Sequence, residues 1–232
     1  MVIDEPMRAY YDARAPEYDD WWHGTGRFAD RERPGWEQDV HALTATLASL
    51  APARQLDVAC GTAFLTRHLQ GRVTAIDQSP AMVAVATARL PHAEVVQGEA
   101  VPLPFPDDAF DRVVTGHFYG HLQEDERARF VAEARRVAPE LVVIDSARRP
   151  DGDAERWEER TLDDDSRHQV YKRWFTGEQL AAELGGGEVL HAGPWFVAVR
   201  ASPRPAWRSA DAPSAASGAP HASSDGPGGG TL

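Results

Sequence analysis

The sequence predicts an α/β fold with one mostly parallel β-sheet and helices on both of its faces. Short β-branched or apolar runs alternate along the chain with longer amphipathic stretches that have helical spacing. Such alternation is typical of strand–helix–strand units, in which a crossover helix covers a parallel sheet. The expected strands are residues 56–58, 73–76, 94–99, 112–115 and 141–144, and the expected helices are residues 37–50, 81–90 and 125–137.

Residues 54–79 contain the most informative of these units. An apolar strand enters a turn of small residues at 59–63, and apolar residues with helical spacing follow at 64–69. A second β-branched run then ends at Asp77, about 20 residues after Asp57, which is the length of one strand–turn–helix–strand step. In such a unit the turn lets backbone N–H groups approach a ligand, and the carboxylate accepts the hydroxyls of a ribose.

The turn alone leaves the ligand open. Gly61 is its only glycine, and Ala59 and Ala63 stand where two more would be expected, so a tight turn without any ligand is one alternative. Dinucleotide enzymes more often carry Gly-x-Gly-x-x-Gly and bind phosphate at the helix N-terminus. Because Asp57 would repel a phosphate, a nicotinamide-dependent oxidoreductase is disfavoured, whereas a sulfonium-bearing amino acid would be accepted.

Composition limits the class of protein. The chain has 232 residues, a formal net charge of −12 and 42% apolar residues, which suits one α/β domain with a sizeable core. The acidity argues against nucleic acid as a partner, since a phosphate backbone requires a basic face. Cys60 is the only cysteine, which excludes an intramolecular disulfide. Without an apolar stretch of ~18 residues or a signal-peptide pattern, we expect a soluble cytoplasmic protein with no membrane contact, as a monomer or homodimer.

The first 50 residues are predicted to form a helical cap. Residues 1–36 are rich in aromatic and charged side chains, and residues 10–18 have helical character up to the turn before Pro16. One interpretation is a helix that only packs aromatic residues onto the domain. The other is a lid over a ligand pocket, in which Arg14 or Tyr18 binds a carboxylate.

The strand–helix alternation breaks at residues 147–175. Residues 148–160 are highly charged and predicted to be helical. Residues 166–175 alternate as in a strand, which places His168 and Lys172 on one face.

The chain then returns to regular structure before its composition changes. A helix at 177–184 follows the N-cap candidate Thr176, and two short strands at 188–191 and 195–200 form a hairpin that closes a sheet edge. Residues 201–232 consist mainly of Ala, Ser, Pro and Gly, so we expect a disordered tail that buries too little surface to offset its ordering entropy.

Four motifs in order resemble those of class I S-adenosylmethionine-dependent methyltransferases. They are Asp57-Val-Ala-Cys-Gly-Thr, Asp77 at the second strand end, Gln97-Gly-Glu-Ala with its Pro-Leu-Pro-Phe loop, and Phe110-Asp-Arg-Val-Val-Thr. The resemblance covers residues 8–200 and implies a Rossmann-like sheet of seven strands whose last strand is antiparallel. We therefore expect one methyltransferase domain at 1–200, with a cap at 1–50, a substrate-side insertion at 148–175 and a tail at 201–232.

The resemblance also implies a cofactor, S-adenosyl-L-methionine, and residues that bind it. Backbone atoms of Ala59 and Gly61, beside Asp57 and Tyr18, would contact the methionine moiety, and Asp77 would hold the ribose hydroxyls. Gln78, Glu99 and Ala100 would flank the adenine, and His117 would lie near the methyl group. Ala63 departs from the glycine usual in the family, and its methyl group is expected to weaken cofactor binding without abolishing it.

A narrower resemblance is to phosphonate-modifying small-molecule O-methyltransferases of bacterial antibiotic pathways. It is carried by His117-Phe-Tyr-Gly-His121 and by the stretches 160–166 and 170–175. It implies O-methylation of a hydroxyl or acidic oxygen on a small molecule in bacterial secondary metabolism. Methylation of nitrogen or carbon remains an alternative, and an oxidoreductase or a non-catalytic cofactor-binding protein are further ones.

Methyl transfer to a hydroxyl requires alignment of the two reactants and removal of a proton. A histidine suits the second task near neutral pH, and His117 is the first candidate base and His121 the second. Either one could instead hydrogen-bond the loop backbone. The sequence places no third ligand beside the pair, so we expect no metal site.

A basic and aromatic cluster is the candidate acceptor site. It comprises Tyr11, Arg14, Arg160, His168, Tyr171 and Lys172, with Arg173 beside them. These side chains suit recognition of an anionic small molecule. The alternative is that they form salt bridges with Asp163, Asp164, Asp165 and other acids.

Overall fold

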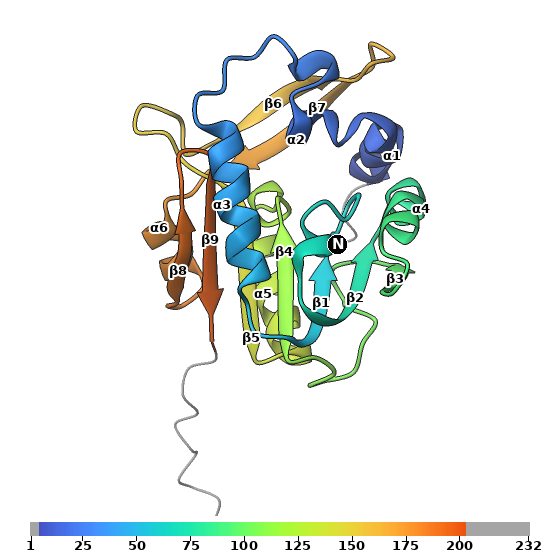
Figure 1. Cartoon of the computed structure of the whole chain (residues 1–232), viewed down its shortest axis with the longest axis vertical. Helices are drawn as coiled ribbons and strands as arrows, with labels where there is room; N and C mark the ends of the chain where they lie inside the picture. Colours follow the sequence, from blue (N-terminus) through green and yellow to red (C-terminus); the bar gives the residue numbers. More distant parts are fainter. Residues whose placement is uncertain (1–4, 203–232) are drawn as a thin grey trace, which may run out of the picture.

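The computed structural model describes residues 5–202, so the predicted tail lies almost entirely outside the described residues. Within this range seven strands form one sheet in the order β3-β2-β1-β4-β5-β9-β8 (Figure 1). Five strands are parallel: β1 (Ala53–Val58), β2 (Gly71–Asp77), β3 (Glu94–Gln97), β4 (Arg112–Gly116) and β5 (Glu140–Ser146). The last strand, β9 (Phe196–Ala201), runs antiparallel between β5 and β8 (Glu188–Ala192), which confirms the predicted topology.

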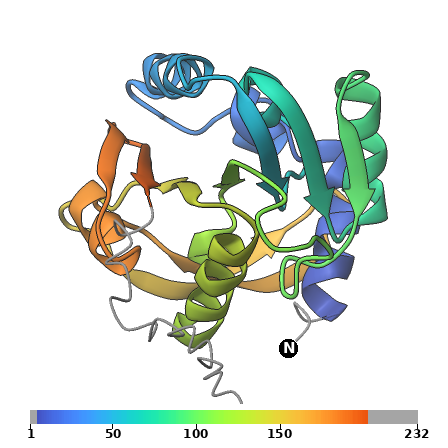
Figure 2. The same ribbon diagram turned by 90° about the horizontal axis from the view of Figure 1, so that it is seen from below.

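Helices cover both faces of this sheet (Figure 2). Alternate residues of the central strands point to opposite sides, as the pleat requires. On one side α3 (Trp36–Ala48) packs Leu43 and Leu47 against Val142. On the other side α5 (Glu124–Val137) and α6 (Gly177–Glu183) pack onto Leu141 and Val143 of the same strand. The two apolar clusters sandwich the sheet, as expected for a doubly wound fold.

Two helix starts were predicted from the N-cap candidates Ser79 and Thr176, and the structure confirms both. The hydroxyl of Ser79 accepts a hydrogen bond from the Met82 N–H at 3.1 Å and caps α4 (Pro80–Arg89). Thr176 does the same for α6, with Gln179 completing a capping box. At the N-terminus α1 (Glu5–Arg14) ends before Pro16, followed by the 3₁₀ turn η1 (Ala15–Glu17), the short helix α2 (Asp20–His23) and a second turn, η2 (Gly26–Phe28).

Two predicted helices are wrong. The apolar residues at 64–69 form only a 3₁₀ turn, η3 (Thr66–His68), because the segment between Val58 at the end of β1 and Gly71 at the start of β2 is mostly taken up by the small-residue turn. The charged stretch predicted to be helical contains a strand, β6 (Glu155–Thr161), paired antiparallel with β7 (Arg167–Arg173). Cross-strand pairing overrides the weak local helix preference there.

The β6–β7 hairpin and α1 lie above the carboxyl ends of the parallel strands (Figure 1). The N-terminal cap is docked on α4 by two carboxylates. Asp12 accepts a hydrogen bond from the Ser79 hydroxyl, and Asp19 accepts from Thr62 Oγ1 at 2.6 Å and pairs with Arg89. None of the helices within residues 5–202 has the length and apolarity needed to cross a membrane.

Candidate active site

A cavity of about 700 Å³ lies at the carboxyl ends of β1, β2 and β4. This is where the strand order reverses, the usual position of a ligand in open parallel sheets. The strand ends contribute Val58, Ala59, Gly61, Asp77, Gln78 and His117 to its wall. The cap and the hairpin contribute Tyr10, Tyr11, Tyr18, Trp157, His168 and Tyr171.

The turn after β1 has left-handed backbone at three residues. The φ angles are 56° at Ala59, 55° at Gly61 and 62° at Ala63. An alanine in this region costs about 1 kcal/mol relative to glycine, so the turn is held against some strain. The Gly61 N–H donates to Asp77 Oδ2 at 2.8 Å, and the Cys60 N–H donates to the Ile76 carbonyl at 3.1 Å. Ala63 is fully buried and does not line the cavity, so its methyl group packs inside the protein.

The two predicted aspartates have different surroundings. Asp77 lines the cavity, and it accepts hydrogen bonds from the Gly61 and Ser79 N–H groups. Burial raises the pKa of Asp77 to about 6, while the two backbone hydrogen bonds oppose this rise. Asp57 lies behind the wall, where Thr66 Oγ1 donates to it at 2.5 Å and burial raises its pKa to about 7. Asp57 therefore joins the end of β1 to η3 behind the cavity wall.

The cap places aromatic side chains over the turn. The Tyr18 ring would lie 3.7 Å from a Cβ atom built on Gly61, which is ordinary van der Waals contact, so it is the left-handed φ of Gly61 that disfavours a side chain there. The Arg14 guanidinium lies 4.8 Å from the centroid of the Tyr18 ring and donates to the Tyr10 hydroxyl at 2.8 Å. Arg14 is buried behind these rings and does not itself line the cavity.

His117 follows β4 in a strained conformation with φ at 57°. Its ring is surrounded by Trp21, Trp22 and Phe196, with centroids 5.0, 5.3 and 5.5 Å away. Burial lowers the pKa of His117 to about 3, against the opposing effect of Asp145, whose Oδ1 is 4.0 Å from Nδ1. Its Nε2 atom is buried with no partner among the described residues, so this side of the cavity has an unmet hydrogen-bonding group.

His121 ends the 3₁₀ turn η4 (Tyr119–His121) and is tied to the hairpin. Its Nδ1 lies 2.7 Å from the carbonyl oxygen of Tyr171. A carbonyl only accepts, so Nδ1 carries the hydrogen and Nε2 of the neutral ring is an acceptor. Burial, followed by the charges of Lys172 and Arg160, lowers the pKa of His121 well below its ordinary value. His117 and His121 are therefore neutral at pH 7.

Lys172 forms a buried ion pair behind the cavity wall. Its Nζ contacts Asp145 Oδ1, and the two side chains are 5% and 0% exposed. The other donors to Asp145 are the Gly120 and Ser146 N–H groups, each at 2.7 Å. The pair joins β7 to β5 and to the turn that carries His121.

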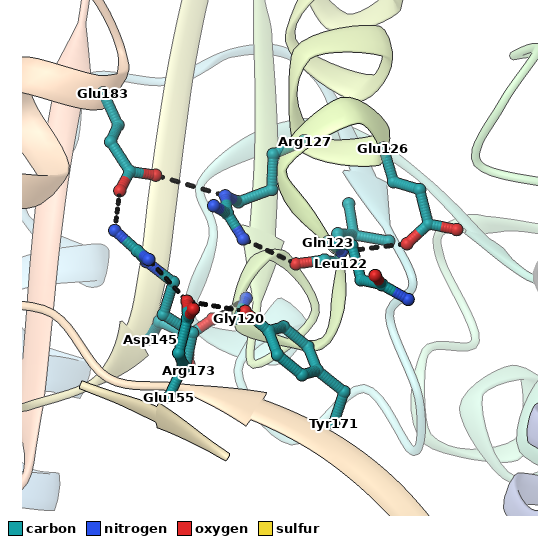
Figure 3. A network of polar contacts seen from close by, with 10 residues as sticks. All are labelled: Gly120, Leu122, Gln123, Glu126, Arg127, Asp145, Glu155, Tyr171, Arg173 and Glu183. Carbon is teal, nitrogen blue, oxygen red and sulfur yellow. Dashed lines mark hydrogen bonds and ion pairs between the residues drawn. The ribbon is translucent and has the colours of Figure 1, made fainter. Parts of the chain in front are cut away.

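Figure 3 shows a second ionic network, which includes the part-exposed side chains of Glu183, Arg173 and Glu155. Glu183 of α6 pairs with Arg127 and Arg173, and Arg173 also pairs with Glu155 at 2.6 Å. Tyr171 donates from its hydroxyl to the same Glu155 at 2.7 Å. The hairpin is thereby fastened to α5 and α6 through side chains far apart in the sequence.

These contacts confirm part of the salt-bridge alternative for the basic cluster. Lys172 pairs with Asp145, and Arg160 pairs with Glu158 at 3.3 Å. The acidic run is occupied elsewhere, because Asp163 and Asp165 bind Arg27 of the cap at 3.0 and 2.7 Å.

The cavity brings together most of the predicted site residues. Those that line it are Tyr11, Tyr18, Ala59, Gly61, Asp77, Gln78, Ala100, His117, His121, His168 and Tyr171. Five others, Arg14, Asp57, Glu99, Arg160 and Lys172, do not line it.

Some cavity residues were missed by the sequence reasoning. No motif in the sequence indicates these residues, which are Tyr10, Gln123, Glu126, Trp157 and Gln169. Trp157 is 59% exposed, and a tryptophan in an otherwise charged strand was the one available signal.

Comparison with known proteins agrees with this geometry. A family model described as "Methyltransferase domain" matches residues 56–140, from β1 to the start of β5. A solved structure described as the DhpI-SAM-HEP complex is similar, with a TM-score of 0.69 and 25% sequence identity over 86% of this chain and 97% of that chain. DhpI thus binds SAM, the cofactor that the sequence predicted for this chain.

Curated relatives match over a shorter stretch. The phthiotriol/phenolphthiotriol dimycocerosates methyltransferase of Mycobacterium leprae is 36% identical over 109 residues, 43% of this chain and 38% of that protein. The demethylmenaquinone methyltransferase of Thermotoga maritima is 34% identical over 107 residues, 44% of each chain. The matched segment spans less than half the length of these relatives. The methyl acceptors given in their names differ from one relative to the other.

Three observations indicate the same class of protein. They are the order of the strands, the cavity where that order reverses, and the matched methyltransferase model. Residues 56–140 therefore form a methyltransferase domain, and the resemblance to class I S-adenosylmethionine-dependent methyltransferases drawn from the sequence is confirmed.

Proposed function

We propose that this protein transfers a methyl group from S-adenosylmethionine to an anionic oxygen of a small molecule. The observation that carries the proposal is one cavity whose two halves are lined by different kinds of polar side chain. The ends of β1 and β2 offer Asp77 and the left-handed turn, while the side next to the hairpin offers the neutral His117 and His121 close to buried positive charges.

The cofactor half fits a nucleoside that carries an amino acid. Asp77 would accept the ribose hydroxyls on the lone pairs left free by Gly61 and Ser79. Ala59 and Gly61 would approach the methionine moiety below Tyr18. Gln78 Oε1, buried without a partner among the described residues, is a free acceptor for the adenine amino group. Two of the predicted cofactor residues, Asp57 and Glu99, would act only through neighbours that do line the cavity.

The acceptor half fits an anion. After burial, the positive charges of Lys172, Arg14 and Arg160 all contribute to lowering the pKa of His117, despite the opposing effect of Asp145. A positive potential therefore reaches the cavity although all three of these cations lie behind its wall. His168 and Tyr171 line this half, and Tyr11 closes it with its ring centroid 6.4 Å from that of His121.

The sulfonium of S-adenosylmethionine supplies an activated methyl group, so the chain's own residues mainly align the acceptor and exclude water. An acidic oxygen is already deprotonated at pH 7 and needs no base. A hydroxyl acceptor would need one, and His121 is then favoured over His117, because its Nε2 is an acceptor in the tautomer fixed by Tyr171. His117, with a pKa of about 3 and a buried ring, would orient the acceptor through Nε2.

Calorimetry with S-adenosylhomocysteine, and with NAD as the control ligand, tests the cofactor half. We expect micromolar binding of the first and none of the second. Binding of NAD alone would support an oxidoreductase, and binding of neither would support a non-catalytic protein.

An acceptor screen tests the second half. Methyl-labelled cofactor is incubated with matched panels of alkylphosphonates, carboxylic acids and neutral alcohols, and the products are identified by mass spectrometry. We expect transfer to the acids, with turnover of His121→Ala within about fivefold of the unaltered protein. Transfer only to alcohols, with a loss of ~100-fold or more in His121→Ala, would replace the anionic acceptor by a hydroxyl and make His121 the base.

A further inference from the structure

A second hollow of about 580 Å³ lies on the outer side of the cap, away from the active-site cavity. It is formed by the end of α2, the start of α3 and the turn η3. Its charged and titratable lining consists of Arg31, Arg33, Arg67, His23, His41 and His68, with Glu37 as its one carboxylate. This is a concentration of positive charge on a chain whose net charge is −12.

The three arginines have no carboxylate partner within the described part of the chain. Each guanidinium instead lies over an aromatic ring: Arg31 over Phe28, Arg33 over Trp36 and Arg67 over Phe64, at 4.7, 4.2 and 4.3 Å from the ring centroids. Many other arginines of this protein are paired with acids, as Arg27, Arg54 and Arg136 are. Stacking holds a guanidinium in place while its N–H edge remains available to an oxyanion.

Further contacts hold two of the three guanidiniums in place. Arg33 donates to the Trp21 carbonyl at 2.6 Å and packs against Gly24, where a Cβ atom would lie 2.3 Å from its Nη2. Burial and then the neighbouring Arg31 lower the pKa of the Arg33 guanidinium. Arg67 donates to His68 Nε2 at 3.2 Å, so its guanidinium is also held by a side chain that lines the hollow.

Two further features of the wall are unmet hydrogen-bond donors. Trp22 lines the hollow and is 4% exposed, and its indole N–H has no partner among the described residues. The 13-residue helix α3 begins in the hollow at Trp36; the Trp36 N–H donates to the Arg33 carbonyl at 3.1 Å, and no side chain caps the N–H groups of Glu37 and Gln38 that follow. Unmet donors beside three guanidiniums suit a ligand that brings several acceptor oxygens.

We propose that this hollow, which we call the arginine groove, binds a small phosphate-bearing anion at a site separate from the methyl-transfer cavity. Its volume is within the range of pockets for metabolite-sized ligands. Phosphate matches the bidentate geometry of arginine and carries enough charge to satisfy more than one guanidinium. The site shares one wall with the active-site region, since the Trp22 ring also packs 5.3 Å from that of His117.

The test uses the full chain saturated with S-adenosylhomocysteine and inorganic pyrophosphate as the probe. Binding is followed by calorimetry and by the fluorescence of the groove tryptophans. We expect Arg31→Gln/Arg67→Gln to bind pyrophosphate ~10-fold more weakly or worse, because two charge-assisted contacts are lost. The matched control is Arg72→Gln/Arg149→Gln, which removes the same charge at two exposed positions outside the groove and should change the affinity less than twofold.

Three outcomes overturn the proposal: no pyrophosphate binding to the unaltered chain, equal weakening in both double variants, or tighter binding of a hexaglutamate peptide than of pyrophosphate. The last would make the groove a docking surface for an acidic protein segment. Thermal melts verify folding, and the exposed single charge reversal Arg31→Glu repeats the measurement if the double variant unfolds. Because cofactor binding is measured separately, failure here leaves the proposed methyl transfer untouched.

Discussion

The two halves of the active-site cavity are built in different ways. The strand-end half comes from one contiguous stretch, in which β1, the left-handed turn and β2 place Asp77 by backbone hydrogen bonds. The hairpin half is assembled by side chains, through the buried pair of Lys172 with Asp145 and the network around Glu183 (Figure 3). The backbone-built half depends on few side chains apart from Asp77, whereas the half built by ion pairs depends on each partner.

The largest effect is expected from Lys172→Ala. Removing the cation leaves the Asp145 carboxylate buried and unpaired, so the free energy of unfolding should fall by about 3–5 kcal/mol. Urea denaturation measures it. Arg167→Ala in the same strand is the matched control, since its pair with Glu159 is exposed and its loss should cost less than about 0.5 kcal/mol. Similar small losses in both variants would contradict a structural role for Lys172.

The next effect concerns cofactor affinity. Asp77→Ala removes the acceptor proposed for the ribose hydroxyls and the acceptor of the Gly61 N–H, so the Kd for S-adenosylhomocysteine should rise ~100-fold or more. Calorimetry measures the change. Asp57→Asn, behind the wall, should alter the Kd less than about threefold. A reversed order would place the cofactor against Asp57.

Stability should depend on pH through Asp57. Its pKa in the folded protein, about 7, is above the unfolded value of ~3.9, so its contribution to stability is complete below pH ~4 and is lost as the pH rises through 7. Asp57→Asn removes this loss. The variant should therefore gain about 2–3 kcal/mol relative to the unaltered protein between pH 5 and pH 8.

Thermal or urea unfolding at the two pH values measures that gain. Asp111→Asn is the control, because Arg54 lowers the pKa of the Asp111 carboxyl and no gain at pH 8 is expected. A flat difference between the Asp57 variant and the unaltered protein would show that Asp57 is ionised throughout.

The smallest effect is expected from Ala63→Gly. The change relieves the left-handed strain at φ 62° but loses a fully buried methyl group and adds freedom to the unfolded chain. Stability should change by less than about 1 kcal/mol, and the Kd for S-adenosylhomocysteine by less than twofold. A tenfold gain in affinity would support the sequence-based expectation that this methyl group obstructs the cofactor.

The sequence by itself determined where the five parallel strands lie along the chain and that Asp77 ends the second of them. These follow from local signals: β-branched runs, a small-residue turn, and caps such as Ser79, which act through nearby backbone atoms. It also predicted that His117 and His121 lie past β4, and both line the cavity.

Only the tertiary structure decided which charged residues face the ligand. Lys172 shares a face of β7 with His168, yet Lys172 is buried on Asp145 and His168 lines the cavity. Likewise Asp57 and Glu99 match family positions but lie outside the cavity wall, and the predicted helix at 148–160 contains β6. Ion pairs and cross-strand contacts join residues far apart in the chain, and their energies depend on burial, which no local pattern encodes.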